Sequence, residues 1–244
     1  MPKTHITAGD VPGIVFTPRD TAPDARLPLV LLGHGAHFGK DDPTMQALCW
    51  GLAYGVPSAV LCIDAPHHGE RRPPGLDDAG FDALVHKGMG DPDTHLRFAD
   101  DWRAAMAAAR AEVPVIDERT GYAGFSMGSI FGVSIVSAIG FQGPIVLAVG
   151  GLRGDDANGA HEQNMLMRTG AETLVDRDVL MLNMTRDEAF PISRAVELFE
   201  LLPTTSKHMV VWQGAHTDLP PAAIEHASTF LQRHFEAATA AQPE

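Results

Sequence analysis

The sequence is poor in cysteine and in basic residues. Its 244 residues include only two cysteines, Cys49 and Cys62. This is too few for a disulfide framework and suits a reducing compartment. Lys and Arg number 18 against 31 Asp and Glu, which gives a formal net charge of −13. A surface with this much negative charge repels phosphate backbones and anionic lipid headgroups. We therefore expect neither nucleic acid nor a membrane as a partner.

Long hydrophobic runs are also missing. No stretch reaches the roughly 18 consecutive apolar residues that a membrane-spanning helix needs. The segment Met1–Asp10 is polar and lacks the basic-then-apolar layout of a secretory signal. We therefore expect a cytoplasmic protein. A composition of 45% hydrophobic and 20% charged residues is typical of globular proteins, and the length suits a single domain over residues 1–244.

Short apolar runs alternate with longer amphipathic ones, a pattern that predicts an α/β fold with a parallel sheet between helices. The expected strands are Leu29–Leu32, Ala59–Ile63, Tyr122–Phe125, Ile145–Val149, Val179–Leu182 and His208–Trp212, with a weaker antiparallel edge at His5–Thr7 and Gly13–Thr17. The expected helices are Thr44–Gly55, Asp93–Glu112, Ser129–Ile139, Ile192–Leu202 and Ala222–Ala237. The polar, irregular segments Arg71–Asp93 and Gly151–Asp176 are predicted to be loops over a site.

The segment 124–128 reads Gly-Phe-Ser-Met-Gly and fits the pattern G-x-S-x-G. It lies between the strand that ends at Phe125 and the buried helix predicted from Ser129. A turn this sharp leaves no space for side chains two residues before and after its apex, which explains Gly124 and Gly128. Ser126 is therefore a candidate nucleophile, and the alternative is a structural serine in a glycine-rich turn.

A serine hydroxyl becomes a good nucleophile only when a base takes its proton and a carboxylate orients that base. Asp187 follows one predicted strand and His216 follows the last one. Because the carboxyl ends of parallel strands open on one edge, both side chains can converge with Ser126 there. Glu188 is the alternative acid, and Asp187 is preferred for its earlier place and shorter side chain. An ordinary loop histidine and a carboxylate at a helix start are the competing interpretations.

Acyl hydrolysis also needs donors for the oxyanion of the tetrahedral intermediate, each supplying roughly 2.7–4 kcal/mol. The backbone N–H of Met127, at the start of the buried helix, is the first expected donor. The second is expected in the loop 33–39, Gly-His-Gly-Ala-His-Phe-Gly, at Ala36 or alternatively at His37.

Other side chains in the predicted strand-end loops are candidates for substrate contact. We expect His37, Phe38, Met165 and Phe190 to bind substrate, although methionine is as often simple core. A second hypothesis is a metal site, built from the histidines of two neighbouring loops with Asp64; these histidines are His34, His37, His67 and His68. No His-x-x-x-His or cysteine-rich spacing supports it, so no metal is expected.

These motifs resemble those of the α/β-hydrolases, and most closely small single-domain serine esterases similar to dienelactone hydrolases and prolyl-oligopeptidase-like esterases. The resemblance rests on the segments Leu29–Gly39, Cys62–Arg71, Gly124–Gly128, Asn183–Pro191 and Gly214–His216. It implies an eight-stranded, mostly parallel sheet with helices on both faces and a Ser126–Asp187–His216 triad. It also implies that His34 and His67 or His68 stabilise loops by hydrogen bonds.

Two departures refine this expectation. Dienelactone hydrolases proper use a cysteine nucleophile, whereas position 126 is serine, which favours ordinary ester hydrolysis. Fewer than 30 residues separate the strand Ile145–Val149 from the next one, so the lid is expected to be minimal. The predicted activity is that of a serine carboxylesterase without cofactor, which cleaves small-molecule esters of small or medium acyl chains. Thioesterase, amidase, acyltransferase, a metal-dependent hydrolase and a non-catalytic binding protein are the alternatives.

Overall fold

Eight strands form one sheet in the order β1-β2-β4-β3-β5-β6-β7-β8 in the computed structural model, which describes residues 2–154 and 159–240. The strands are β1 (Lys3–Ala8), β2 (Val11–Phe16), β3 (Leu27–Gly33), β4 (Ala59–Ile63), β5 (Ile116–Phe125), β6 (Ile145–Ala148), β7 (Val179–Met184) and β8 (Lys207–Trp212). β2 pairs antiparallel with both β1 and β4, and all other pairs are parallel. The mostly parallel sheet with an antiparallel edge is thus confirmed.

The inner strands are continuously apolar because both of their faces are covered. Every residue of β3, β4, β6 and β7 is buried, whereas β1 and β8, at the two edges, alternate with exposed positions. β5 begins at Ile116, six residues before the predicted start at Tyr122. Its first half carries the polar run Asp117–Arg119, which is only partly covered, so hydropathy does not mark it as a strand.

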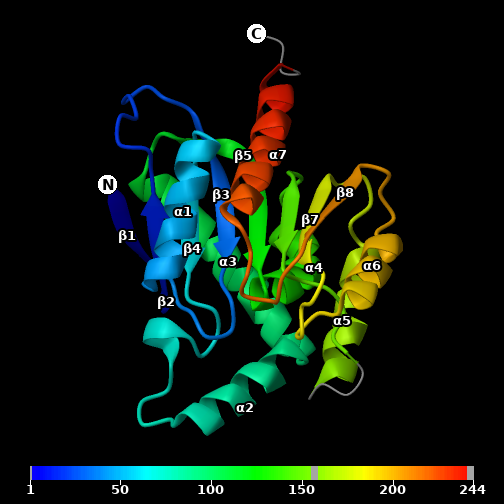
Figure 1. The fold of residues 1–244 in the computed structure, drawn as a ribbon. Coiled ribbons are helices and arrows are strands. Elements are labelled where there is room, and N and C mark those ends of the chain that lie inside the picture. The colour runs from blue at the N-terminus through cyan, green and yellow to red at the C-terminus, as the bar shows by residue number, and fades with distance from the viewer. Residues whose placement is uncertain (1, 155–158, 241–244) are drawn as a thin grey trace.

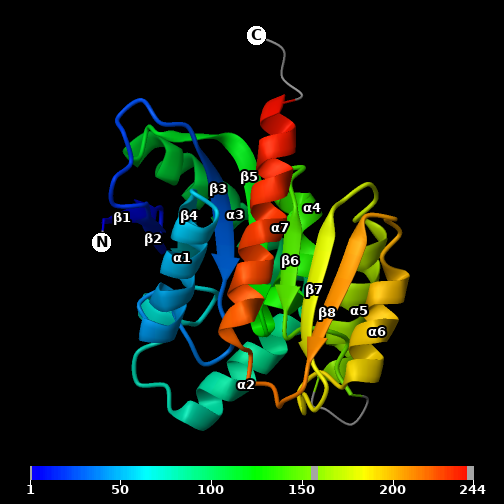
Figure 2. The ribbon, with the colours of Figure 1, turned by 45° about the horizontal axis from the view of Figure 1, so that its top comes forward.

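Helices cover both faces of the sheet, α1 and α7 on one face and α3, α4, α5 and α6 on the other (Figures 1 and 2). Their bounds are α1 (Pro43–Gly55), α3 (Pro92–Glu112), α4 (Met127–Ile139), α5 (Ala160–Glu172), α6 (Ile192–Leu201) and α7 (Pro221–Ala240). Asp42 and Asp91 cap the first turns of α1 and α3, each accepting a hydrogen bond from a backbone N–H two or three residues on. Within the described ranges, no helix is long and apolar enough to cross a bilayer.

The two segments predicted to be irregular loops each contain a helix, so that part of the prediction is wrong. The first starts at the end of a short 3-10 turn, Gly69–Arg71, and contains α2 (Asp78–Met89), and the second contains α5. In α2 the buried side chains Phe81, Val85 and Met89 recur every four residues, but three nearby glycines obscure the pattern. In α5 the buried face includes Gln163 and Asn164, whose polarity hides the amphipathic period.

α2 covers one end of the sheet and is called the lid below. In Figures 1 and 2 it lies across the lower end of the sheet, where the carboxyl ends of the parallel strands emerge. It contacts α3 and α4. The segment after β6 adds one helix, α5, in keeping with the small lid expected there.

Candidate active site

Ser126 stands at the tight turn between β5 and α4. Its backbone has φ 55° and ψ −113°, a conformation that L residues rarely adopt. A Cβ on Gly124 would lie 2.4 Å from the carbonyl oxygen of Gly128, and one on Gly128 would lie 2.2 Å from the carbonyl oxygen of Gly33. Both flanking glycines are therefore required by close backbone packing, as the motif predicts.

The structure brings together the three side chains predicted to form the triad. His216 Nε2 lies 2.9 Å from Ser126 Oγ, and His216 Nδ1 lies 2.8 Å from Asp187 Oδ2. Since a carboxylate can only accept, Nδ1 carries the proton and Nε2 is free to accept from the serine hydroxyl. The carboxylate is itself oriented, because Asp187 Oδ1 accepts hydrogen bonds from the backbone N–H groups of Ala189 and Phe190, at 2.9 and 2.8 Å.

Glu188, the alternative acid, lies outside this arrangement. Its side chain is exposed, and Oε2 accepts a hydrogen bond from the backbone N–H of His216 at 3.2 Å rather than from the ring. Hydrogen bonds from its own N–H and from that of His216 lower the pKa of Glu188. The Asp187 side chain, by contrast, is completely buried against the imidazole. The geometry therefore favours Asp187 as the residue that orients His216.

The expected oxyanion donors flank the serine. A Cβ on Gly35 would lie 3.7 Å from Ser126 Cβ, so the loop after β3 lies against the nucleophile. The Gly35 carbonyl accepts from His34 Nδ1 at 2.8 Å and from the Phe38 N–H at 3.1 Å. Because the two ends of a peptide point in opposite directions, the Ala36 N–H is turned away from these donors. Across the described residues, neither Ala36 nor Met127 donates its N–H to another group of the chain.

Two histidines hold this loop in place. Buried His34 accepts a hydrogen bond at Nε2 from the Ala65 N–H, 2.9 Å away, so Nδ1 must carry its proton. Burial, together with neighbouring His68, lowers the pKa of His34 to about 4 and keeps it neutral. His68 Nε2 lies 2.7 Å from the carbonyl oxygen of Ala36. In the described part of the chain, no three His, Cys, Asp or Glu side chains are grouped so that they could hold a metal ion.

Lys40, a residue that the sequence did not single out, anchors the end of the same loop. Its side chain is buried, and Nζ donates to Asp64 Oδ2 at 3.1 Å, to Asp41 Oδ2 at 2.7 Å and to Glu70 Oε1. Burial alone would lower the pKa of Lys40, but the hydrogen bonds to these three carboxylates outweigh it and raise the pKa. Its own backbone N–H also donates to Asp64 Oδ1 at 2.8 Å. The loop that carries Ala36 is thereby tied to the end of β4.

No protein-family model and no curated protein matches this sequence. Solved structures do. A cold-adapted esterase from an Arctic intertidal metagenomic library superposes with a TM-score of 0.74 at 25% identity, over 95% of this chain and 92% of that one. The chain has the α/β-hydrolase fold. TT1662 from Thermus thermophilus has a TM-score of 0.72 at 21% identity (96% of this chain, 98% of the other), and the dienelactone hydrolase from Anabaena variabilis has 0.64 at 16% (97% and 96%). The resemblance to esterases and hydrolases supports a hydrolase in general terms.

The four residues expected to bind substrate occupy different places on this α/β-hydrolase fold. Phe190 is buried beside Asp187, its ring centroid 5.7 Å from that of His216. His37 and Phe38 line a cavity of about 570 Å³ between the loop 33–39 and α2. There His37 Nδ1 lies 4.0 Å from Asp82 Oδ1 of α2. Met165, on α5, is 55% exposed. Their roles in substrate binding stay predictions.

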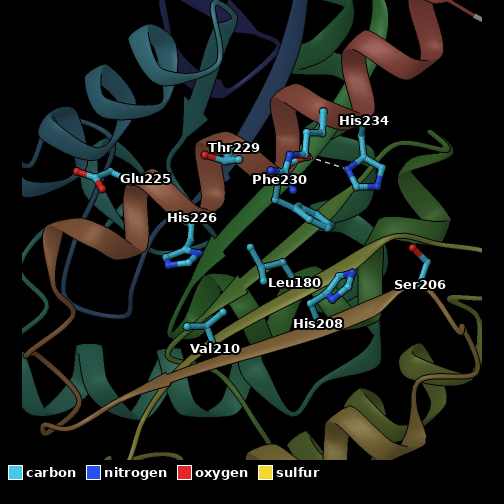
Figure 3. A pocket seen from close by; sticks show the side chains of 10 residues that line it. Leu180, Ser206, His208, Val210, Glu225, His226, Thr229, Phe230 and His234 are labelled. Carbon is cyan, nitrogen blue, oxygen red and sulfur yellow. Dashed lines mark hydrogen bonds between the residues drawn. The ribbon is translucent and has the colours of Figure 1, made fainter.

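A larger cavity, of about 670 Å³, lies on the face of the α/β-hydrolase sheet that α7 covers, between α7 and the strands β7 and β8 (Figure 3). Side chains of β8 and α7 extend into it, and its lining is Leu180, Ser206, His208, Val210, Glu225, His226, Thr229, Phe230, Arg233 and His234. None of the predicted site residues is among them. This cavity is therefore distinct from the site at the carboxyl edge.

Proposed function

We propose that the protein is a serine esterase that cleaves carboxylic esters of small or medium acyl chains through an acyl-serine intermediate. The observation that carries this proposal is the unbroken hydrogen-bonded chain from Ser126 through His216 to Asp187, at a strained turn on the carboxyl edge of the sheet. A structural serine would need neither the strained backbone nor a histidine already oriented by a buried carboxylate.

In the first half of the reaction, Ser126 Oγ attacks the ester carbonyl carbon while His216 Nε2 takes the hydroxyl proton. Asp187 stabilises the imidazolium that forms. The negative charge moves to the former carbonyl oxygen, which accepts hydrogen bonds from the N–H groups of Met127 and Ala36. His216 then gives its proton to the departing alkoxide, the carbon–oxygen bond to the alcohol breaks, and the acyl group remains on Ser126.

The second half repeats these steps with water. His216 Nε2 removes a proton from a water molecule, whose oxygen attacks the acyl-serine carbonyl. The oxyanion that forms accepts hydrogen bonds from the same two N–H groups. Collapse of the intermediate breaks the bond to Ser126 Oγ, which regains its proton from His216, and the free acid leaves. The enzyme returns to its starting state without a cofactor.

Substitution of the nucleophile tests the proposal. In Ser126→Ala, hydrolysis of nitrophenyl esters should fall by about 10⁶-fold, and labelling by a fluorophosphonate probe should disappear, while the circular dichroism spectrum is retained. Ser137→Ala, an exposed serine of α4, is the matched control and should keep both activities. Nitrophenyl esters of increasing acyl length should show a cutoff beyond medium chains. Undiminished hydrolysis or labelling in Ser126→Ala would refute the serine mechanism.

A further inference from the structure

Arg153 follows β6 and is fixed in position by its backbone. Its N–H donates to Asn164 Oδ1 at 2.7 Å, and its carbonyl oxygen accepts from Asn164 Nδ2 at 3.1 Å. The same carbonyl also accepts from Arg194 Nε at 3.1 Å. The start of the Arg153 side chain is thus held by both α5 and α6.

The guanidinium of Arg153 includes a hydrogen-bond donor that has no acceptor. Nε is buried and has no hydrogen-bond partner, and across residues 2–154 and 159–240 no acidic side chain forms an ion pair with this cation. Arg71, which is also half-buried, forms by contrast an ion pair with Asp101 at 2.7 Å. Leaving a buried donor unsatisfied destabilises the folded chain, and more so when the donor is charged. Such a cost is understandable where a ligand supplies the acceptor.

A single aromatic ring separates this cation from the proposed triad. Arg153 Cζ lies 5.5 Å from the centroid of the Phe190 ring, and the same ring lies 5.7 Å from His216. Burial lowers the pKa of Arg153 and the charge of Asp187 raises it. Asp187 does not serve as its partner, because both carboxylate oxygens are already engaged with His216 and with backbone N–H groups.

The lid and α5 bring further unsatisfied polar atoms to the same place. His86 Nδ1, on α2, is buried without a partner, and burial followed by the charge of Arg153 lowers the pKa of His86. Gln163, on α5, is completely buried, and its Oε1 also lacks a partner. Its Nε2 lies 3.5 Å from the His86 carbonyl oxygen, so the two residues adjoin. Buried polar atoms of α2, of α5 and of the segment after β6 are therefore left without a partner.

We propose that Arg153 binds a carboxylate carried by the ester substrate, so that the site is specific for esters with an acidic group. A guanidinium presents parallel N–H groups that match a carboxylate, and His86 Nδ1, which has no partner within the chain, can add a further hydrogen bond. A chain of net charge −13 repels anions in general, so an anionic substrate needs a cation built into its site. This inference rests on the proposed esterase function.

The test compares charged and neutral esters of the same length. Nitrophenyl monoesters of succinic, glutaric and adipic acid place the carboxylate on the acyl side, and acetyl esters of hydroxy acids place it on the alcohol side. Methyl esters of those free acids are the neutral counterparts. We expect the unaltered enzyme to prefer the charged form in one of the two series. In Arg153→Gln the ratio of kcat/KM for charged over neutral esters should fall roughly 10- to 100-fold, mainly through KM.

The controls separate this role from a structural one. Arg153→Lys keeps the charge but not the fork, and should retain part of the preference. Arg233→Gln removes an exposed arginine of α7 and should change nothing. In Ser126→Ala, calorimetric binding of glutarate should weaken on addition of Arg153→Gln and with added salt. Equal losses for charged and neutral esters, or no loss of preference, would overturn the inference while leaving the esterase intact. Absence of both probe labelling and ester cleavage would instead overturn the proposed function, and this inference with it.

Discussion

Two buried histidines should make the stability of this protein fall as the solution is acidified below neutrality. His34 and His95 are 2% and 4% exposed. His95 lies between the Met89 carbonyl oxygen, 3.0 Å from Nε2, and Ser134 Oγ, 2.5 Å from Nδ1. Burial is the main cause that lowers the pKa of each from 6.5 to about 4.

The sign and size follow from proton linkage. Between about pH 6.5 and 4 the unfolded chain binds protons at these two positions and the folded chain does not, so acid favours unfolding. A shift from 6.5 to about 4 corresponds to a loss of about 3 kcal/mol per histidine once both forms are protonated, and about 2 kcal/mol each at pH 5. The pair therefore removes about 4 kcal/mol at pH 5, a large part of the roughly 5–15 kcal/mol that stabilises a typical domain.

Urea denaturation followed by circular dichroism at pH 7.5 and pH 5.0 measures this loss. His34→Gln and His95→Gln should each be less stable at pH 7.5, because a buried hydrogen bond is lost. Each should nevertheless lose about 2 kcal/mol less between the two pH values than the unaltered protein. His161→Gln, which replaces an exposed histidine, should keep the full difference. An unchanged pH difference in both core variants would refute the reasoning.

Two further predictions concern the proposed active site. Asp187→Asn should lower kcat by about 10⁴-fold, because the wrong tautomer of His216 is favoured, whereas Glu188→Gln should stay within a few-fold of the unaltered enzyme. Steady-state kinetics of the two variants with a nitrophenyl ester measures this difference. Equal losses of kcat in both variants would contradict the assignment of Asp187. Gly128→Ala places a Cβ 2.2 Å from the Gly33 carbonyl oxygen, so urea denaturation should show a loss of about 4 kcal/mol or more, and full stability would contradict the packing at this turn.

Much of the fold was predictable because its signals are local. The inner strands are covered on both faces, so they are continuous apolar runs that need no knowledge of their neighbours. The glycines around Ser126 are required by the turn that they form. The place of Asp187 and His216 follows from a general rule, because parallel strands deliver their ends to one edge.

The sequence by itself thus determined the sheet, the strained serine turn and the set of residues that could meet beside it. The tertiary structure decided which of two adjacent acids faces the imidazole, and it showed α2 and α5 where loops were expected. It also decided that Lys40 is buried among carboxylates while Arg153 has no carboxylate partner within the described residues. The physical reason is that the surroundings of a charged side chain are formed by residues distant in the sequence. No local pattern of hydropathy shows whether those residues supply hydrogen-bond acceptors or aromatic rings.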